Sequence, residues 1–380
     1  MMPMDLGFLG GGQLARMSIQ AAQRMGLSCL SLDPDPKSPA SQIGPAIQGA
    51  LNDAQAVAKI VGNCQRITLE NEFIPAGVIA AALEQVGRTP DVVIPGLDTL
   101  ATIQDKLRQR EALHRAGVPS PLAIELSDDA AIAVARLGYP LVLKARFGGY
   151  DGKGTLTIRD ATELEDTRPR WSDGGWLAEA FVPFERELAV MVVRTPTMTA
   201  VFPTMETVQS HHVCDLVFPA TADASAIAIA AVEAVNGFGI FGVELFEEPN
   251  GRLSVNELAP RPHNTGHFSL DWGGVSQFDQ HVRAVMGLPL AAIGGQPTCM
   301  ANLMGQPNVR DWRRGLAAAL SLDPDIRVHW YGKVDSRPGR KMGHLNAVGP
   351  DAKVRAVAAR GRFYRAWVSN IQDTNELGVE

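Results

Sequence analysis

The sequence predicts a mixed fold, α/β in its first hundred residues and α+β in the rest. The first hundred residues alternate short apolar runs with segments of helical periodicity, which is the pattern of βαβ units in a doubly wound parallel sheet with helices on both faces. Residues 176–194 and 199–208 instead alternate like antiparallel strands. With 380 residues, the chain is long enough for two or three domains at about 100–200 residues each.

The N-terminal βαβ pattern can be assigned element by element. We expect strands at 6–9, 27–33, 66–70 and 91–96, and helices at 13–26, 53–63 and 76–87. Gly26 and Gly87 stand where the first and third of these helices would end, because glycine adopts the left-handed conformation of a helix C-terminus without steric cost.

Beyond residue 97 the pattern changes. A long amphipathic helix is expected over 98–117, with Asp98 or Thr99 as its N-cap and Gly117 at its end. The remaining predicted elements are a strand at 139–145, a glycine-rich loop at 148–154, strands within 176–194 and 199–208, a helix within 224–239, a β-hairpin from residue 241 that turns at Pro249-Asn250-Gly251, a strand at 327–333 and a helix at 351–360.

The composition argues against nucleic acid and membranes as partners. The formal net charge of −6 gives no overall basic field that would recruit nucleic acid. The sequence contains no run of about 18 apolar residues, the length that spans a bilayer. The N-terminus also lacks the basic segment and apolar stretch of a signal peptide. We therefore expect a cytoplasmic protein.

A glycine-rich turn near the N-terminus allows two interpretations. The spacing Gly10-x-Gly12-x-x-Ala15 matches the dinucleotide fingerprint G-x-G-x-x-G/A. Asp33 ends the next apolar run, near the position about 20 residues on where a Rossmann enzyme carries its ribose-binding acid. The turn therefore belongs either to a nicotinamide enzyme or to another kind of nucleotide pocket that needs close approach of the backbone.

A second glycine-rich stretch, KARFGGYDGKG, follows a predicted strand. Lys144 ends the strand and Lys153 lies inside the glycine-rich segment. Such a turn can fold over a polyphosphate with its backbone N–H groups while lysines neutralise the charge. The spacing is not that of Walker A, and an ordinary surface hairpin is the alternative.

Two acids lie on apparently adjacent strands. Glu244 in GVELF and Glu257 in VNELAPR are each surrounded by apolar residues, and Asn256 stands beside the second. Because unpaired carboxylates are seldom buried, each needs a partner or a metal. Two carboxylates and an amide oxygen suit Mg²⁺ carried by nucleotide phosphates. Two separate surface ion pairs are the alternative.

Two polar clusters complete the candidate chemistry. The stretch 261–267, RPHNTGH, has zinc-like H-x-x-x-H spacing, but its prolines and glycine favour a polar loop lining a pocket over a metal-binding helix. Lys333, Arg337, Arg340 and Lys341 form a local basic cluster in an acidic protein. Arginine and lysine suit a phosphate, although a solvated charge run is the alternative.

Together these stretches resemble the ATP-grasp enzymes, and among them the family that carboxylates 5-aminoimidazole ribonucleotide in purine biosynthesis. The resemblance extends over almost the whole chain, and NELAPRPHNTGH with RPGRKMGH separates this family from other ATP-grasp ligases. It implies an N-terminal doubly wound domain over 1–100, a linker helix with a small lid subdomain over 101–182, and a C-terminal ATP-grasp domain with a terminal sheet region over 183–380. It also implies a homodimer.

The resemblance implies that ATP and Mg²⁺ bind between the lid and the grasp domain. Glu244 and Glu257 would hold Mg²⁺, and Glu187 would accept hydrogen bonds from the ribose. The other implied ATP contacts are Lys106, Lys144, Gly148, Gly149, Tyr150, Asp151, Gly152, Lys153, Gly154, Glu179, Ala180, Phe181, Val182, Gln209 and Asn256. The segment METVQSHHVCDL departs from the family pattern, so His211 or His212 could take the place of Gln209.

The implied reaction uses ATP to phosphorylate bicarbonate, which gives carboxyphosphate. The amine of 5-aminoimidazole ribonucleotide is then carboxylated, directly or through released CO₂, giving N5-carboxyaminoimidazole ribonucleotide. Tyr150 and Asp151 would close over the intermediate, Arg261 and His263 would orient bicarbonate or the amine, and Lys333 completes the expected catalytic set. The residues implied for the ribonucleotide are Gln13, Leu14, Glu72, Asn264, Lys333, Arg340 and Lys341.

Three alternatives remain at this point. The formate-dependent glycinamide ribonucleotide transformylase shares the fold, but Asn264 in place of aspartate and Gln13 in place of glutamate argue against it. A nicotinamide dehydrogenase built on Gly10–Ala15 leaves Glu244, Glu257 and the basic cluster unexplained. A non-catalytic nucleotide-binding module would bind ATP without any turnover.

Overall fold

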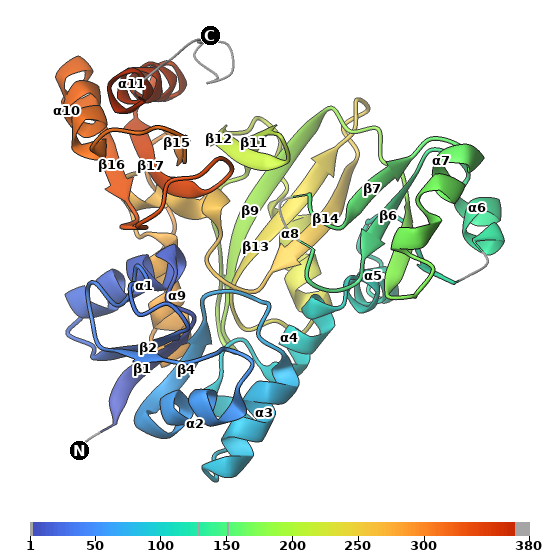
Figure 1. The fold of residues 1–380 in the computed structure, drawn as a ribbon, viewed down its shortest axis with the longest axis horizontal. Coiled ribbons are helices and arrows are strands. Elements are labelled where there is room, and N and C mark those ends of the chain that lie inside the picture. The colour runs from blue at the N-terminus through green and yellow to red at the C-terminus, as the bar shows by residue number, and fades with distance from the viewer. Residues whose placement is uncertain (1–2, 128–129, 150–151, 369–380) are drawn as a thin grey trace.

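The computed structural model describes residues 3–127, 130–149 and 152–368, and Figure 1 shows how they are arranged. Within these residues the strands form three sheets. A large antiparallel sheet runs through the middle of the molecule, with a small parallel sheet from the N-terminus on one side and a small antiparallel sheet on the other (Figure 1).

The N-terminal sheet is parallel throughout, as predicted. Its order is β3-β2-β1-β4. Its strands are β1 (Met4–Leu9), β2 (Cys29–Asp33), β3 (Ala46–Gln48) and β4 (Cys64–Leu69), and the helices of this region are α1 (Gln13–Arg24), α2 (Ala54–Asn63) and α3 (Ala76–Gln85). The sequence did not predict the short strand β3. Gly26 and Gly87 have φ of 78° and 65°, so both end their helices as expected.

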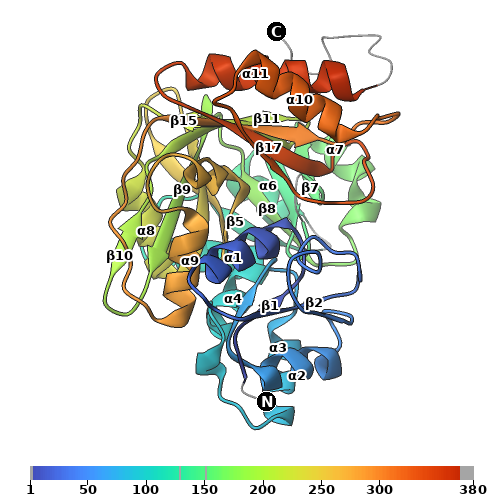
Figure 2. The same ribbon diagram turned by 90° about the vertical axis from the view of Figure 1, so that its left-hand side faces the viewer.

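Helices cover both faces of this sheet, but one of them comes from a distant part of the chain. Apolar side chains of α2 and α3 pack on one face. On the other face α1 packs together with α9 (Gln277–Met286), and Figure 2 shows these two helices side by side. The N-terminal sheet is therefore anchored to a helix of the C-terminal half.

The prediction of a strand over 91–96 is wrong. Pro90–Val92 form a short 3-10 helix, and only Val93 bridges to Ile67 of β4. Proline has no N–H to donate to a ladder, and this segment contains both Pro90 and Pro95. Pairing therefore cannot continue into a regular strand.

The single helix predicted over 98–117 is also wrong. The chain forms α4 (Leu97–Gln104) and α5 (Lys106–Arg115), which are separated by Asp105. The Asp105 carboxylate accepts a hydrogen bond from the backbone N–H of Leu107 at 3.0 Å and so caps α5. It also accepts two hydrogen bonds from Arg146, at 3.0 and 2.6 Å. The capping hydrogen bond and the ion pair to Arg146 together stabilise the interruption at Asp105 more than a continuous helix would be stabilised there.

The small antiparallel sheet carries the glycine-rich segment. It has the order β5-β8-β6-β7. Its elements are β5 (Ala123–Leu126), α6 (Ala131–Leu137), β6 (Leu141–Ala145), β7 (Thr155–Ile158), α7 (Ala161–Asp166), the 3-10 helix η2 (Arg168–Arg170) and β8 (Trp176–Ala180). The glycine-rich segment joins β6 to β7 along the chain. A hydrogen bond of 2.8 Å from the backbone N–H of Ala145 to the carbonyl of Gly154 closes this connection.

The large sheet is continuous from one half of the molecule to the other (Figure 1). Its order is β14-β13-β9-β11-β12-β15-β17-β16, with β10 added on β9, and all of these pairs are antiparallel. The strands are β9 (Arg186–Arg194), β10 (Thr199–Val201), β11 (Met205–Ser210), β12 (Val213–Pro219), β13 (Gly239–Glu247), β14 (Leu253–Ala259), β15 (Thr298–Met304), β16 (Arg327–Trp330) and β17 (Lys341–Val348).

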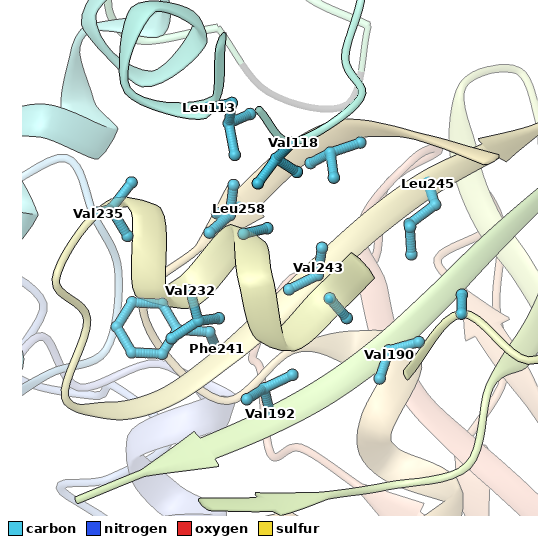
Figure 3. Packing of buried hydrophobic residues seen from close by; sticks show 14 of the residues in the cluster. Leu113, Val118, Val190, Val192, Val232, Val235, Phe241, Val243, Leu245 and Leu258 are labelled. Carbon is cyan, nitrogen blue, oxygen red and sulfur yellow. The ribbon is translucent and has the colours of Figure 1, made fainter. Parts of the chain in front are cut away.

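Helices close the outer faces of this sheet. Figure 3 shows α8 (Ser225–Ala234) with its Val232 packed near Phe241 of β13 and Val192 of β9. At the other end, α10 (Trp312–Leu322) and α11 (Ala352–Trp367) cover β15 and β17. The predicted helices within 224–239 and at 351–360 and the hairpin turn at Pro249-Asn250-Gly251 are confirmed. No described helix has the length and apolar character needed to cross a membrane.

Candidate active site

The two predicted metal-binding acids are direct cross-strand partners. Glu244 of β13 lies opposite Glu257 of β14 in the antiparallel ladder. Directly opposite residues have Cβ atoms about 4.5–5.5 Å apart, which is close enough for two carboxylates to share one cation. The prediction that these acids come from adjacent strands is therefore confirmed.

These two carboxylates have very different proton affinities. Burial, together with the charges of Glu257 and Glu187, raises the pKa of Glu244 to about 8. Burial also acts to raise the pKa of Glu257, but Lys106, whose Nζ lies 2.5 Å from Glu257 Oε2, lowers it to about 2. At neutral pH Glu244 therefore keeps its proton while Glu257 is ionised, and a cation bound between them would favour the ionised form of Glu244 as well.

A buried ion network lies beside this pair. Glu179 of β8 is 2% exposed, and its carboxylate accepts from Arg110 Nε at 2.7 Å and from Lys144 Nζ at 2.8 Å. Burial would raise the pKa of Glu179, but these two cations lower it to about 2. Lys144 also donates to Asn256 Oδ1 at 3.1 Å. Because the Glu179 carboxylate is engaged by these two cations, any adenine contact by Glu179 falls to its backbone.

The glycine-rich segment lies over the same region. Gly148, Gly152 and Gly154 have φ of 71°, 73° and 75°, a left-handed conformation that favours glycine. A side chain built on Gly149 would come within 3.7 Å of Lys106 Cε, so this segment runs close to the acid pair. Two residues of the predicted ATP contacts in this segment, Tyr150 and Asp151, lie outside the described residues.

In the structure Glu187 of β9, which is predicted to bind the ribose, lies beside Gln209 of β11. The two side chains are hydrogen-bonded, and burial raises the pKa of Glu187. His212, in the turn after β11, is close enough for its charge to act on the same carboxylate. The structure therefore brings together Gln209 and Glu187, two of the predicted ATP contacts.

The N-terminal glycine turn is already filled by carboxylates. The backbone N–H of Gly11 donates to Asp33 Oδ2 at 2.7 Å, and that of Leu14 lies 3.4 Å from Glu70 Oε1. A Cβ on Gly12 would lie 2.2 Å from Glu70 Oε1. A dinucleotide pyrophosphate needs this space and these N–H groups, so the geometry argues against the nicotinamide alternative.

The sequence analysis did not name Glu70, which lies at the glycine turn, and predicted Glu72 as the substrate-binding acid of this region. Glu70 follows β4, the strand beside β1, and the carboxyl ends of neighbouring parallel strands meet at one edge of a sheet. Burial raises the pKa of Glu70, while the charges of Arg261 and Lys333 act to lower it. Glu72 instead pairs with Arg261, whose Nη2 donates to Glu72 Oε1 at 2.8 Å. The signal for Glu70 was its place at the end of a strand.

The basic cluster of the C-terminal region faces this turn. Lys333 Nζ donates to the carbonyl of Lys341 at 2.7 Å, and burial, followed by the charge of Arg340, lowers the pKa of Lys333 to about 8. Gln42 Nε2 donates to the carbonyl of Gly332 at 2.7 Å, which ties the cluster to the N-terminal domain. Lys333 also lies close enough to Glu70, the acid at the glycine turn, for the two charges to act on each other.

The loop after β14 joins the two halves of the site. His263 Nε2 lies 3.6 Å from Glu244 Oε1, and burial and the charge of Arg261 lower the pKa of His263 to about 3, so this imidazole is neutral. Asn264 is buried, and its amide exchanges hydrogen bonds of 2.6 and 3.2 Å with Asn302. Its side chain is therefore engaged within the protein.

The same loop does not form a zinc site. His267, the second histidine of the H-x-x-x-H spacing, is fully buried, and its Nδ1 lies 2.7 Å from Gln277 Nε2. Residues 264–270 form the 3-10 helix η3 (Asn264–Leu270). Across the described ranges no group of three or more histidine, cysteine or acidic side chains is placed to hold a metal by itself.

Three family models match consecutive parts of the chain. They describe a ribonucleotide synthetase preATP-grasp domain over residues 2–104, an ATP-grasp domain over 111–278 and a phosphoribosylaminoimidazole carboxylase C-terminal domain over 298–357. The chain is also 40% identical, over 353 residues, to the N5-carboxyaminoimidazole ribonucleotide synthase of Synechococcus elongatus. The aligned region covers 90% of this chain and 88% of that protein.

Solved structures show the same similarity. The N5-carboxyaminoimidazole synthase of Aspergillus clavatus, in complex with ADP and 5-aminoimidazole ribonucleotide, superposes with a TM-score of 0.86 at 31% identity over 96% of this chain and 99% of that one. A carboxyaminoimidazole ribonucleotide synthase of the same organism in complex with ATP gives a TM-score of 0.85 at 32% identity, again over 96% and 99%.

Proposed function

The chain belongs to the N5-carboxyaminoimidazole ribonucleotide synthase family of ATP-grasp ligases, and we propose that it carboxylates 5-aminoimidazole ribonucleotide with ATP and bicarbonate. ATP transfers its γ-phosphoryl group to bicarbonate, which gives carboxyphosphate and ADP. The exocyclic amine then forms a bond to the carboxyl carbon, the bond from that carbon to the phosphate oxygen breaks, and the amine loses a proton. N5-carboxyaminoimidazole ribonucleotide and phosphate are the products.

One observation carries this proposal. Lys341, from the basic cluster, lies close enough to Glu244 for its charge to lower the pKa of that acid, and it acts on His263 as well. This proximity supports a single site that includes the acid pair and the basic cluster. A metal-bound triphosphate and a sugar phosphate can meet there, which is what transfer of a group between them requires.

Mg²⁺ fits the acid pair. Burial, together with the charges of Glu257 and Glu187, raises the pKa of Glu244, and a bound cation would favour the ionised form of this acid. Hard carboxylate oxygens are also the ligands that Mg²⁺ prefers. Glu244 and Glu257 would hold the ion, with the nucleotide phosphates supplying further oxygens. When bound, it would neutralise charge on the transferring phosphoryl group.

The remaining ATP contacts follow from the placement of each group. Lys144, held by Glu179 and Asn256, would face the phosphates with the glycine-rich segment above it. Glu187, oriented by Gln209, would accept from the ribose hydroxyls. Lys106 would turn from Glu257 to the phosphates once a cation holds that acid.

The ribonucleotide would lie between α1 and the basic cluster. Lys333, Arg340 and Lys341 would bind its phosphate, since lysine and arginine are suited to that group. Glu70, which lies at the glycine turn within reach of the charge of Lys333, would accept from the ribose hydroxyls. Gln13 and Leu14, at the start of α1, complete this side.

The neutral His263 would orient bicarbonate next to the acid pair. Its Nδ1 lies 2.9 Å from Thr265 Oγ1, which fixes the ring. With a pKa of about 3, this imidazole is a poor base at neutral pH, so its role is to bind and orient. Arg261, held by Glu72, adds positive charge beside it. Exclusion of water here protects the carboxyphosphate from hydrolysis.

The division into domains at residues 100 and 182, a homodimer and a cytoplasmic location are part of the same proposal. The change from a parallel to an antiparallel sheet after the N-terminal helices supports the first boundary. Sedimentation equilibrium of the purified protein tests the dimer, which would have twice the chain mass of 40.7 kDa.

The test of this function is a substrate comparison. The purified protein is given Mg-ATP with either 5-aminoimidazole ribonucleotide and bicarbonate or glycinamide ribonucleotide and formate. We expect ADP formation and incorporation of labelled bicarbonate only in the first mixture. Turnover with formate would overturn the proposal in favour of the transformylase, and ATP binding without turnover in either mixture would indicate a binding module.

A further inference from the structure

The turn between β11 and β12 has an unusual backbone. It consists of His211 and His212, because Ser210 pairs with Val213 in the ladder. Both histidines have positive φ, 50° and 63°. A two-residue turn with both residues left-handed favours Asn-Gly, so two histidines hold this turn in a strained conformation. Strain of this kind concentrates at functional sites.

The strained turn lies directly against the glycine-rich segment. A Cβ built on Gly152 would lie 2.7 Å from His212 Cβ and 2.8 Å from His212 Cγ, which is closer than such atoms approach. Only glycine therefore allows the backbone at residue 152 to rest on the His212 side chain. The contact joins the small sheet to the large sheet across the ATP side of the site.

His212 also lies near the ribose-side acid. Its charge acts on Glu187, and Glu187 is hydrogen-bonded to Gln209 at the end of the same strand. The turn thus lies between the group expected to bind the ribose and the segment expected to cover the phosphates. A side chain at this point can fix the distance between those two contacts.

We propose that His212 is a positioning residue for ATP. It supports the backbone at Gly152, so that the N–H groups of residues 152–154 are aligned with the nucleotide phosphates. This inference rests on the proposed ATP-dependent function. It differs from direct replacement of Gln209, because His212 acts through Gly152.

A double-mutant cycle tests the contact. The variants are Gly152→Ala, His212→Gly and the pair together, with Gly148→Ala as the matched control. Gly148 has nearly the same φ as Gly152, 71° against 73°, but a Cβ there meets nothing within 4 Å. Both alanines therefore bear the same backbone strain, and only one of them collides with His212. His211→Gly is the second control, since it relieves a similar turn strain.

The dissociation constant of a non-hydrolysable ATP analogue with Mg²⁺ and the KM for ATP are measured for each variant, together with the thermal midpoint. We expect Gly152→Ala to weaken nucleotide binding about tenfold more in the native background than in the His212→Gly background, the size of coupling that contacting residues show. Gly148→Ala should weaken binding by the same factor in both backgrounds, and Gly152→Ala should not couple to His211→Gly.

An equal effect of Gly152→Ala in both backgrounds would overturn the proposal. So would a coupling seen only in the thermal midpoint, since that shows a structural contact without a role in nucleotide binding. Because the analogue is never turned over, the coupling measured from its dissociation constants is independent of the carboxylation assay. Failure of the cycle with normal carboxylation by the native protein would reject the role of His212 alone.

Discussion

Glu244 and Glu257 face each other across the ladder of β13 and β14, and at neutral pH they carry one negative charge between them. Glu244, with a pKa of about 8, keeps its proton, whereas Glu257, with a pKa of about 2, is ionised beside Lys106. A cation that binds both oxygens favours the charged form of Glu244. Binding should therefore release a proton.

We predict the release of about one proton when the Mg-bound ATP analogue binds at pH 7. Glu244, with a pKa of about 8, is mostly protonated at this pH, and it would lose its proton on binding the cation. Calorimetric titration in buffers of different ionisation enthalpy measures it. Glu244→Gln has no proton to lose, so its binding heat should not depend on the buffer, and its kcat should fall about 100-fold or more. A buffer-independent heat for the native protein would contradict the assignment.

Lys333 should make ribonucleotide binding sensitive to alkaline pH. Burial, with the charge of Arg340, lowers its pKa to about 8, so the ammonium is present below this pH and is lost above it. The dissociation constant for 5-aminoimidazole ribonucleotide, measured without nucleotide, should rise as the pH increases through 8. Lys333→Arg stays charged, and its dissociation constant should remain level to about pH 9.5. If both proteins lose affinity alike, another group is responsible.

Glu179 should stabilise the fold in a way that acid removes. Its pKa is lowered from 4.5 to about 2, so the contribution is complete above about pH 4.5 and is lost as the pH falls to about 2. At one pKa unit per 1.36 kcal/mol, it amounts to about 3 kcal/mol. Urea unfolding of Glu179→Gln should show a lower free energy at pH 7 and a flatter decline below pH 4.5.

The control for this measurement is Glu163→Gln. Glu163 forms a 2.9 Å ion pair with Arg159, but this pair lies at the surface, with Arg159 73% exposed. Exposed pairs contribute little, so the free energy of unfolding should hardly change. An equal loss in both variants would show that burial of the Glu179 network has no special effect.

We expect Glu70 to act in substrate binding and Glu72 to stabilise the structure. Glu70→Gln replaces one carboxylate oxygen at the glycine turn with an amide NH2 group, and we expect the KM for the ribonucleotide to rise about tenfold, the effect of losing a hydrogen bond to a charged group. Glu72→Gln leaves Arg261 without its ion pair, and its main effect should be a lower thermal midpoint. The reverse pattern would return the substrate role to Glu72.

The parallel N-terminal sheet and the later antiparallel strands could be predicted because hydrophobic periodicity is a local signal. The break at Asp105 could not, since it depends on Arg146, whose approach is set by the small sheet. The packing of α9 on the N-terminal sheet could not be predicted from local sequence either, because α9 lies far away along the chain. Tertiary partners decided both features.

The acid pair was predictable because charged residues within apolar strands need a partner. Glu70 and Glu72 could not be separated, because they stand two residues apart and only the neighbouring glycine turn decides which one faces it. That turn matches a dinucleotide fingerprint, yet Asp33 and Glu70 fill it. Spacing alone does not show what a glycine turn binds.

The continuous large sheet has a consequence for how the two substrates are spaced. β13 and β17 are five strand-to-strand steps apart, about 24 Å if the sheet were flat at about 4.8 Å per step, yet Lys341 of β17 acts on the charge of Glu244 of β13. The sheet must therefore curl around the reaction centre. The gap that the carboxyl group has to cross is then a property of backbone curvature, and a single-residue insertion in an intervening strand could change it without altering any residue that touches a ligand.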